Sequence, residues 1–283
     1  MSTSTTPKSV IVTGGASGIG LTIARHFASQ ASKVAILDLN PSTGNSVAAD
    51  LAAEYPQATI TFHKCDVSSW HEQAQAFALV YVTFGRIDIV FANAGIAEGM
   101  SNALATINPE APEEPNLKVV EVDLHAVINS VKLAIHYMVK NEVAGSSRGS
   151  IICTASDAAL YPFPVGPIYS AAKAGVIGLV RSTAPIVEEH KIQINTFAPA
   201  ALVTNIIPDP ELYKHMVVTP MSTLIKGLRL VEDPSINGQV GEIHDDEPTV
   251  RDPPYNFVSE GSRHNAEKSW EMFKAFRAAT GNA

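Results

Sequence analysis

The sequence predicts a doubly wound α/β fold, in which a parallel sheet of about seven strands forms one domain. Two observations carry this prediction. Short β-branched runs alternate with longer helical patterns through the first 200 residues, which is typical of βαβ units. The predicted strands are also nearly continuous hydrophobic runs, as expected for parallel strands that are covered on both faces.

The strands and helices of this region follow from the periodicity of the hydrophobic residues. Six strands are predicted, over residues 9–13, 33–38, 59–63, 87–92, 150–154 and 192–197. Helices are predicted between them, near residues 18–31, 43–55, 69–84, 117–142 and 168–190. Each strand–helix–strand connection is expected to be right-handed and to return the chain to the same sheet.

The region beyond Thr204 is less regular and is punctuated by prolines. It predicts a helix near 209–231, a strand over 239–244, an acidic loop over 245–255 and a last amphipathic helix near 263–279. Ligands of open α/β sheets bind beyond the carboxyl ends of the strands. We therefore expect residues 205–283 to form a lid-like extension. No repeat or flexible linker occurs, so residues 1–283 are predicted to form one domain.

Composition excludes several classes of protein. The chain has 20 basic and 28 acidic residues among 283, a net charge of −8, which argues against a nucleic-acid-binding surface. Two cysteines, Cys65 and Cys153, cannot form a disulfide framework or a cysteine-rich zinc site, and the nine histidines show no paired spacing for a metal. No apolar stretch reaches membrane-spanning length and the start lacks a signal-peptide core. These features predict a cytoplasmic protein without metal or membrane.

A glycine-rich segment, TGGASGIG over 13–20, follows the first strand and opens the first helix. Gly14, Gly18 and Gly20 allow a tight turn in which backbone N–H groups approach a pyrophosphate. The positive end of the helix dipole points at the same anion. A glycine-rich turn without ligand is the alternative, but its placement between a strand and a helix favours a dinucleotide site.

Asp38 ends the second strand, 18 residues after Gly20. A carboxylate at this point can accept both hydroxyls of an adenine ribose and so selects NAD. No Lys or Arg lies between Lys33 and Lys64 to bind the 2′-phosphate of NADP. As an alternative, Asp38 could cap the helix that begins near residue 41, although Asn40 would serve that role better.

Tyr169 and Lys173 are four residues apart and share one face of a predicted helix. A phenol is a poor base at neutral pH, but a neighbouring ammonium and the positive nicotinamide ring both favour the tyrosinate. Tyr169 could then exchange a proton with an alcohol as a general base. Ser156, just past the fifth strand, could orient the substrate oxygen. An ordinary exposed Tyr–Lys pair is the alternative interpretation.

The motifs together resemble those of the short-chain dehydrogenase/reductase family, of the NAD-dependent single-domain kind with a Rossmann-type fold. They are TGGASGIG, the Asp38 strand end, CDV over 65–67, ANAG over 92–95, Ser156, YSAAK over 169–173 and NTFAPAALVT over 195–204. They occur in the order typical of the family and cover about residues 8–205. The segment after Asp123 and the long tail are most similar to the hydroxyprostaglandin dehydrogenase branch, which includes fungal secondary-metabolite alcohol dehydrogenases.

The resemblance implies a set of cofactor-binding residues. Asp66 and Val67 would flank the adenine, residues 93–95 would pass beneath the cofactor, and Leu202 and Thr204 would fix the nicotinamide end. The full set is Gly14, Ser17, Gly18, Ile19, Gly20, Asp38, Leu39, Asp66, Val67, Asn93, Ala94, Gly95, Tyr169, Lys173, Leu202 and Thr204. In the alternative interpretation Val67 and Ala94 are core residues, and Asp66 caps the helix that starts near Ser69.

Two departures from the family pattern bear on catalysis. Asp123 stands where the family usually has an asparagine that organises a proton path to the lysine, so its part in a relay is an open question. A carboxylate there could position water and would pair with Lys173 if the two are close. The Pro-Gly usual after the sixth strand is Pro199-Ala200 here.

The resulting expectation is an enzyme that uses NAD to interconvert a secondary alcohol and a ketone. Its catalytic residues would be Ser156, Tyr169 and Lys173, with Asp123 as the fourth candidate. Apolar residues beyond 204 suggest a lipophilic substrate. The resemblance implies a homodimer or homotetramer, through the helices near 117–142 and 168–190. The alternatives are an NADPH-dependent carbonyl reductase and a non-redox binding or pericyclase-like protein on the same scaffold.

Overall fold

The computed structural model describes residues 7–98, 104, 110–207, 210–233, 235–251 and 257–280. The chain separates into two compact units, residues 1–250 and residues 251–283. The first unit contains the sheet, and the second contains the helix α8 (Glu260–Thr280). The expectation that residues 1–283 form one domain stays a prediction.

Eight strands form one sheet in the order β3-β2-β1-β4-β5-β6-β7-β8. Their bounds are β1 (Ser9–Thr13), β2 (Lys33–Asp38), β3 (Thr59–Lys64), β4 (Ile89–Ala92), β5 (Gly149–Thr154), β6 (Ile192–Pro199), β7 (Val240–His244) and β8 (Glu247–Arg251). All pairs from β3 to β7 are parallel. The strand order reverses beside β1, so the predicted doubly wound α/β class is confirmed, and the crevice for a ligand is expected at the β1–β4 switch point.

β8 corrects the predicted acidic loop over 245–255. A two-residue turn, Asp245 and Asp246, joins β7 to β8, and so short a connection requires an antiparallel pair. Asp245 has φ +44°, a conformation that Asp tolerates better than most residues. The strand escaped prediction because it is mostly exposed and lacks the hydrophobic run of a buried strand.

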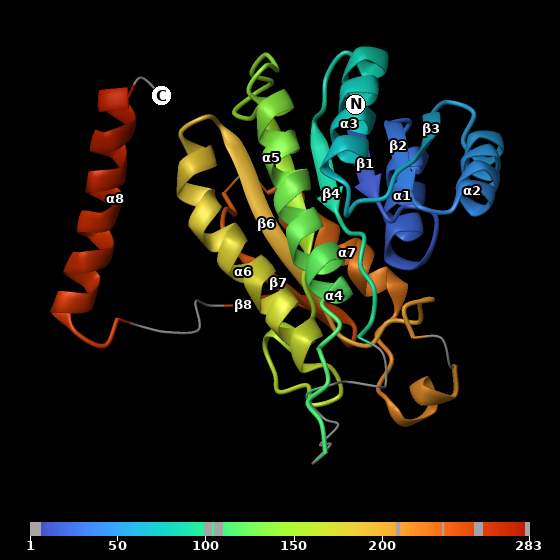
Figure 1. Cartoon of the computed structure of the whole chain (residues 1–283). Helices are drawn as coiled ribbons and strands as arrows, with labels where there is room; N and C mark the ends of the chain where they lie inside the picture. Colours follow the sequence, from blue (N-terminus) through green and yellow to red (C-terminus); the bar gives the residue numbers. More distant parts are fainter. Residues whose placement is uncertain are drawn as a thin grey trace. The chain divides into compact units, whose positions relative to one another are not determined.

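Helices cover both faces of the sheet (Figure 1). One face carries α3 (Trp70–Phe84), α5 (Ala126–Met138) and α6 (Pro167–Glu188), and the other carries α1 (Gly18–Ser29), α2 (Pro41–Glu54) and α7 (Met221–Glu232). Two hydrophobic cores result, one on each face. The inward side chains of β4 divide between them: Val90 packs in the first core and Phe91 in the second.

Two predicted helices are broken in the structure. The segment 117–142 consists of α4 (Lys118–Val120), a π-helical turn η1 (Glu121–His125) and α5. The segment 209–231 consists of a 3₁₀ helix η3 (Pro210–His215) and α7, with Pro220 directly before α7. Hydrophobic periodicity alone cannot reveal such breaks, because the apolar face continues across them.

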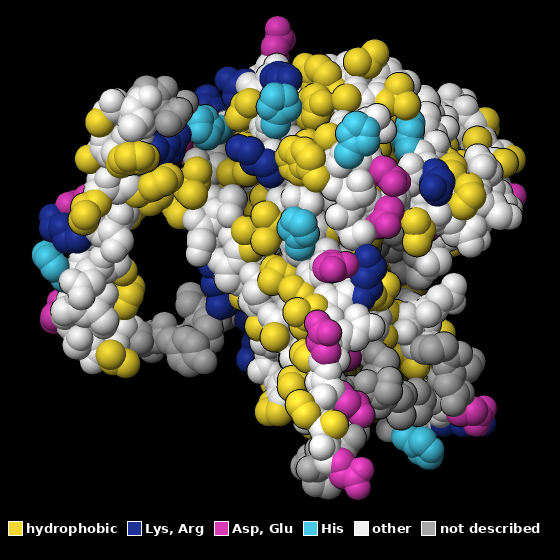
Figure 2. Space-filling model, viewed as in Figure 1, with side chains coloured by type: hydrophobic (Ala, Val, Ile, Leu, Met, Phe, Trp, Pro, Cys, Tyr) yellow, Lys and Arg dark blue, Asp and Glu magenta, His cyan; other side chains and the backbone are white. Residues whose placement is uncertain are grey.

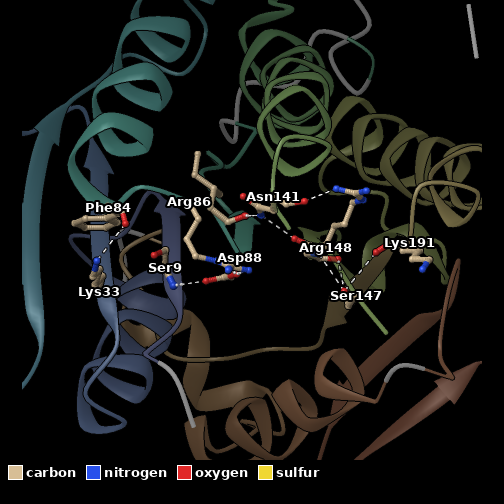
Figure 3. A network of polar contacts seen from close by, with 11 residues as sticks. Ser9, Lys33, Phe84, Arg86, Asp88, Asn141, Ser147, Arg148 and Lys191 are labelled. Carbon is tan, nitrogen blue, oxygen red and sulfur yellow. Dashed lines mark hydrogen bonds and ion pairs between the residues drawn. The ribbon is translucent and has the colours of Figure 1, made fainter. Parts of the chain in front are cut away.

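A polar network closes the end of the sheet where the strands begin (Figure 3). Asp88 accepts a hydrogen bond from the Ser9 N–H at 2.9 Å and another from Arg86 at 2.8 Å. The amide of Asn141 donates to the carbonyls of Ile87 and Arg148 at 2.7 and 2.8 Å. These bonds satisfy buried polar groups at the amino ends of the strands, which leaves the carboxyl ends for the site.

Candidate active site

Two glycines of the loop between β1 and α1 and of the helix start occupy positions without room for a side chain. Gly14 has φ +62°, and a Cβ there would lie 2.8 Å from the Cα of Ala94. A Cβ on Gly20 would collide with the carbonyl oxygen of Gly14. Both positions therefore require glycine, and the backbone of the loop is open to close approach by a ligand.

The N-terminus of α1 is suited to an anion. Ser17 occupies the N-cap without a side-chain hydrogen bond to the helix, and the first turn holds no acidic residue. The free N–H groups and the positive end of the dipole are thus not neutralised by the protein itself. Gly18, Ile19 and Gly20 form this first turn, so the predicted cofactor loop fits a pyrophosphate.

Asp38 lies beside this loop, where it accepts hydrogen bonds from backbone N–H groups and does not cap a helix. Its Oδ2 accepts a hydrogen bond from the Ala16 N–H at 3.0 Å, and its Oδ1 accepts one from the Asn40 N–H at 3.1 Å. The cap of α2 is Asn40, which accepts from the N–H groups of Ser42 and Thr43, so the capping alternative for Asp38 is wrong. Each carboxylate oxygen keeps a lone pair for a ribose hydroxyl.

Two neighbours of Asp38 matter for a nucleotide. Leu39 is 60% exposed, which leaves an apolar surface next to the carboxylate. Lys64 ends β3 directly opposite Asp38 in the parallel register, and it is exposed. The sequence did not predict that Lys64 lies opposite Asp38, because 26 positions separate the two residues in the chain.

Asp66 is held in a loop and does not cap α3. Its Oδ1 accepts from the hydroxyl of Ser68 at 2.6 Å and from the Ser68 N–H at 2.9 Å. The Ser68 hydroxyl bond is the largest cause that lowers the pKa of Asp66. The N-cap of α3 is Ser69, which accepts from the Glu72 N–H, so the capping alternative for Asp66 is also wrong. Val67 is buried.

A chain of contacts joins the glycine loop to the end of β5. Asn93 donates from Nδ2 to the Thr13 carbonyl at 3.1 Å and accepts at Oδ1 from the Thr154 hydroxyl at 3.1 Å. Lys173 Nζ in turn donates to the Thr154 carbonyl at 3.0 Å. Ala94 packs against Gly14. The predicted cofactor and catalytic residues therefore meet at adjacent strand ends, where the sheet topology places a ligand site.

Lys173 lies between Tyr169 and Asp123. Its Nζ is 5.5 Å from the centre of the Tyr169 ring and 3.0 Å from Asp123 Oδ2. Asp123 Oδ1 accepts from the Ile96 N–H at 2.9 Å. Asp123 is fully buried and Lys173 is 2% exposed. The pairing that sequence reasoning left conditional is therefore present, and it is carried by the π-helical turn η1.

Burial and charge act against each other in this pair. Burial is the largest single influence and lowers the pKa of Lys173, but the charge of Asp123, its hydrogen bond and the nearby Tyr169 together outweigh burial, so that the pKa of Lys173 lies above its usual value. Burial raises the pKa of Asp123, although Lys173 opposes the shift. A Cβ on Gly95 would lie 2.8 Å from Asp123 Oδ2 and 3.3 Å from Lys173 Nζ. The bare backbone of Gly95 therefore lies directly against the ion pair.

Ser156 is buried just past β5. It caps the 3₁₀ turn η2 (Asp157–Ala159): its Oγ accepts from the Ala158 N–H at 3.2 Å and donates to Asp157 Oδ1 at 3.0 Å. The turn η2 packs against α6, the helix that carries Tyr169 and Lys173. The structure thus brings the three predicted catalytic residues to the same end of the sheet.

Glu98 is a neighbour of Tyr169 that sequence reasoning missed. Its Oε2 accepts a hydrogen bond from the Tyr169 N–H at 2.8 Å. Gly166 is the N-cap of α6 and provides no side-chain cap, so Glu98 satisfies an N–H group at this helix end from 71 residues away. The sequence does contain one signal, because Gly166-Pro167 begins a helix whose first turn lacks a capping side chain.

The loop after β6 is tied to the glycine loop. A Cβ on Gly18 would lie 3.1 Å from the Cβ of Thr204. Tyr213, which was not predicted as a site residue, donates to the Leu202 carbonyl at 2.9 Å and accepts from the Thr204 N–H at 3.2 Å. This tyrosine holds Leu202 and Thr204 next to the start of α1.

Comparison with known proteins decides the family. The profile of the short chain dehydrogenase family matches residues 8–210. The chain belongs to this family. The match covers every predicted site residue and extends to the loop after β6. Members of the family use nicotinamide cofactors, and the glycine loop fits such a group.

The chain is similar to fungal proteins in sequence and to solved structures in fold. The chain is 37% identical over 202 residues to the short-chain dehydrogenase/reductase prx4 of Penicillium roqueforti, covering 71% of this chain but only 56% of that relative. It is 32% identical over 263 residues to prx6 of Penicillium rubens, covering 86% of this chain and 84% of the relative. The crystal structure of levodione reductase has a TM-score of 0.73 at 25% identity, over 84% of this chain and 96% of that one.

Three further findings concern the described part of the chain. Within it, no helix is long and apolar enough to cross a membrane. No group of three or more His, Cys, Asp or Glu side chains gathers there as for a metal ion. The described residues cover all predicted cofactor and catalytic positions, whereas residues 252–255 of the predicted acidic loop lie outside them.

Proposed function

We propose that this oxidoreductase uses NAD to interconvert a secondary alcohol and a ketone. The observation that carries the proposal is the position of Lys173. Its ammonium lies 5.5 Å from the Tyr169 ring and bonds the Thr154 carbonyl, one contact away from the asparagine that touches the glycine loop. This arrangement is suited to a phenol that exchanges protons beside a bound dinucleotide.

Each residue has a stated part in this chemistry. When bound, the nicotinamide cofactor accepts or supplies a hydride. Tyr169 takes the proton of the alcohol, and the Lys173 ammonium favours the tyrosinate by its positive charge. Ser156 orients the substrate oxygen. Asp123 holds the ammonium in place and, through the Ile96 N–H, the loop after β4.

The preference for NAD rests on Asp38. A carboxylate at the ribose end accepts hydroxyl groups and repels a 2′-phosphate. A similar solved structure, a 3-ketoacyl-(acyl-carrier-protein) reductase from Brucella melitensis, is described as complexed with NADH. The second candidate is an NADPH-dependent reductase, which one observation favours: Lys64 lies opposite Asp38 in the sheet and could pair with the 2′-phosphate.

We propose a lipophilic substrate because apolar side chains are exposed around the site. Tyr161, Phe163 and Val165 are exposed in the segment between Ser156 and α6, and the Phe163 ring lies 6.2 Å from the Tyr169 ring. Val203 and Val217, in the segments that follow β6, are also exposed. Surfaces of this kind bind an apolar substrate body while a few polar groups orient its reacting end.

We further propose a cytoplasmic homodimer or homotetramer that assembles through α5 and α6. Figure 2 shows hydrophobic side chains interspersed with charged and histidine side chains on the face that these helices form. Both cysteines are free and buried, as in proteins of a reducing compartment. Gly178 is exposed on α6, so Gly178→Arg should yield monomers in sedimentation velocity if this face is the interface.

The direct test is a panel of aliphatic and cyclic secondary alcohols with NAD or NADP, followed by the absorbance of the reduced cofactor. The proposal expects turnover with NAD at a higher kcat/KM than with NADP. Turnover with NADP alone would establish the second candidate. Absence of turnover together with tight NAD binding would favour the non-redox alternative.

A further inference from the structure

One carboxyl group lies next to Ser156, a second one interacts electrostatically with the first, and neither has a part in the chemistry described so far. The first is Asp157, whose Oδ1 accepts the Ser156 hydroxyl at 3.0 Å. The second is Glu242 on β7, which is only 6% exposed and accepts the Tyr161 hydroxyl at 3.0 Å. Glu242 acts on Asp157 by like-charge repulsion.

The hydroxyl of Ser156 has only one hydrogen to donate, and Asp157 already accepts it. A serine hydroxyl has one hydrogen and two lone pairs. In the structure the Ala158 N–H occupies one lone pair, and the hydrogen points at Asp157. A ketone oxygen has no hydrogen of its own, so it can bond Ser156 only if that hydrogen turns away from Asp157. An alcohol carries its own hydrogen and depends less on this donor.

Protonation of Asp157 would reverse the bond. A carboxylic acid can donate to the remaining lone pair of Ser156 Oγ, and the serine hydrogen is then available to the substrate. Burial is the largest cause that raises the pKa of Asp157, and the charge of Glu242 adds to it, whereas the bonds from Ser156 and the Ala158 N–H lower it. The net direction is upward, which brings protonation closer to neutral pH.

The elements around Asp157 contribute few other titratable groups. The turn η2 packs against α6 and β6. The strand β6 carries no titratable side chain. The titratable residues that α6 and β7 bring to this end of the sheet, with the tyrosine after η2, are Tyr169, Lys173, Glu242, His244 and Tyr161. Of these, Lys173 is paired with Asp123, and His244 bonds Thr249 at 3.0 Å.

We propose that Asp157 is a positioning residue that sets the direction of the Ser156 O–H bond, so that its protonation turns this donor from Asp157 toward a bound ketone. The proposal rests on the proposed function for its substrate. The consequence is that the binding of ketone and the binding of alcohol depend differently on pH. Ketone binding is strongest below the midpoint of the Asp157 titration and weakens above it, whereas alcohol binding changes little over the same range.

The titration is measured first, without any substrate. Protein labelled with ¹³C at the Asp carboxyl carbons is followed by NMR from pH 3 to 8, and the Asp157 signal is the one that Asp157→Asn removes. The Ser156→Ala variant should raise the midpoint, because a donor to the carboxylate is lost, and Glu242→Gln should lower it, because a like charge is lost. An Asp157 midpoint that neither variant moves would overturn the proposal.

Ketone binding is measured second, as the KM in reduction for the ketone of the best alcohol in the panel. Wild-type KM should rise about two- to tenfold across the Asp157 midpoint, the equivalent of one neutral hydrogen bond. Asp157→Asn cannot ionise, so its KM should not change with pH over the same range. A wild-type KM independent of pH, with normal turnover, refutes the switch and leaves the proposed function intact. If no compound is turned over, the proposed function fails, while the NMR titrations still decide whether Asp157 and Ser156 are coupled.

Discussion

Asp123 and Lys173 form an ion pair with 3.0 Å between Oδ2 and Nζ, in a place from which solvent is almost fully excluded. Charges in such surroundings act strongly on their neighbours. The same ammonium faces the Tyr169 ring, so the carboxylate offsets part of the positive charge that favours the tyrosinate. A relative with asparagine at this position would leave that charge uncompensated.

The Asp123→Asn variant tests this relationship. Removing the carboxylate leaves the charge of the Lys173 ammonium uncompensated, so the acidic limb of the alcohol-oxidation profile should move to lower pH. The measurement is kcat/KM as a function of pH. Asp88→Asn is the matched control, since Asp88 is also a buried carboxylate paired with a cation but lies at the other end of β4. A profile that stays in place, or that moves to higher pH, would contradict this account.

Glu98 should affect turnover through the backbone of Tyr169. Glu98→Ala removes the acceptor of the Tyr169 N–H, and α6 has no other cap at this end. We expect kcat to fall several-fold, the KM for NAD to stay constant, and the free energy of unfolding to fall by about 1 kcal/mol. Glu98→Gln retains a carbonyl acceptor and should recover most of kcat. Equal losses in both variants would show that the acceptor is not what matters.

Cofactor choice should depend on the Asp38–Lys64 pair of positions. In Asp38→Ala, the proposed bonds to the ribose hydroxyls should be lost and the repulsion of a 2′-phosphate should disappear. NAD binding should weaken by about ten- to hundredfold, while NADP binding should strengthen. Adding Lys64→Ala to this variant should cancel the gain for NADP. The dissociation constants can be measured by calorimetry, and tighter binding of NADP than NAD by the wild-type protein would refute the role given to Asp38.

Even a glycine-to-alanine substitution in the glycine loop should weaken cofactor binding. In Gly20→Ala the new methyl group meets the Gly14 carbonyl, so the loop must shift, with a cost to the free energy of unfolding of about 1–3 kcal/mol and a strong loss of NAD affinity. Gly261→Ala in α8 is the control, because a Cβ there meets only the Ser259 hydroxyl at an ordinary 3.7 Å. NAD affinity unchanged in Gly20→Ala would mean that the pyrophosphate does not bind this loop.

Local pattern was enough to predict most of the fold. Strands such as Ser9–Thr13 and Lys33–Asp38 were predicted with their observed bounds, because a buried parallel strand must be a continuous hydrophobic run. The exposed strand β8 and the π-helical turn at Asp123 were not predicted. The first has no hydrophobic run, and the second changes the hydrogen bonds of a helix without changing its apolar face.

The residues of the site likewise fall into those that the sequence could predict and those that it could not. Motifs within one segment, such as the glycine loop and the Tyr169–Lys173 spacing, could be predicted, since a turn or a helix fixes their geometry. The hydrogen bond of Glu98 with Tyr169 and the electrostatic interaction of Asp157 with Glu242 could not, because each joins segments more than 70 residues apart. Only the order of the strands brings such residues together, and no spacing in the sequence records it.

The most direct test of the proposed chemistry is the turnover of Tyr169→Phe with the best alcohol of the panel, measured beside its dissociation constant for NAD. The account predicts that kcat falls by at least about a hundredfold, the smaller contribution expected of a general base, while NAD affinity stays within a few-fold of wild type. An unchanged kcat would contradict the assignment of Tyr169 as the proton-exchanging group and, with it, the proposed dehydrogenase mechanism.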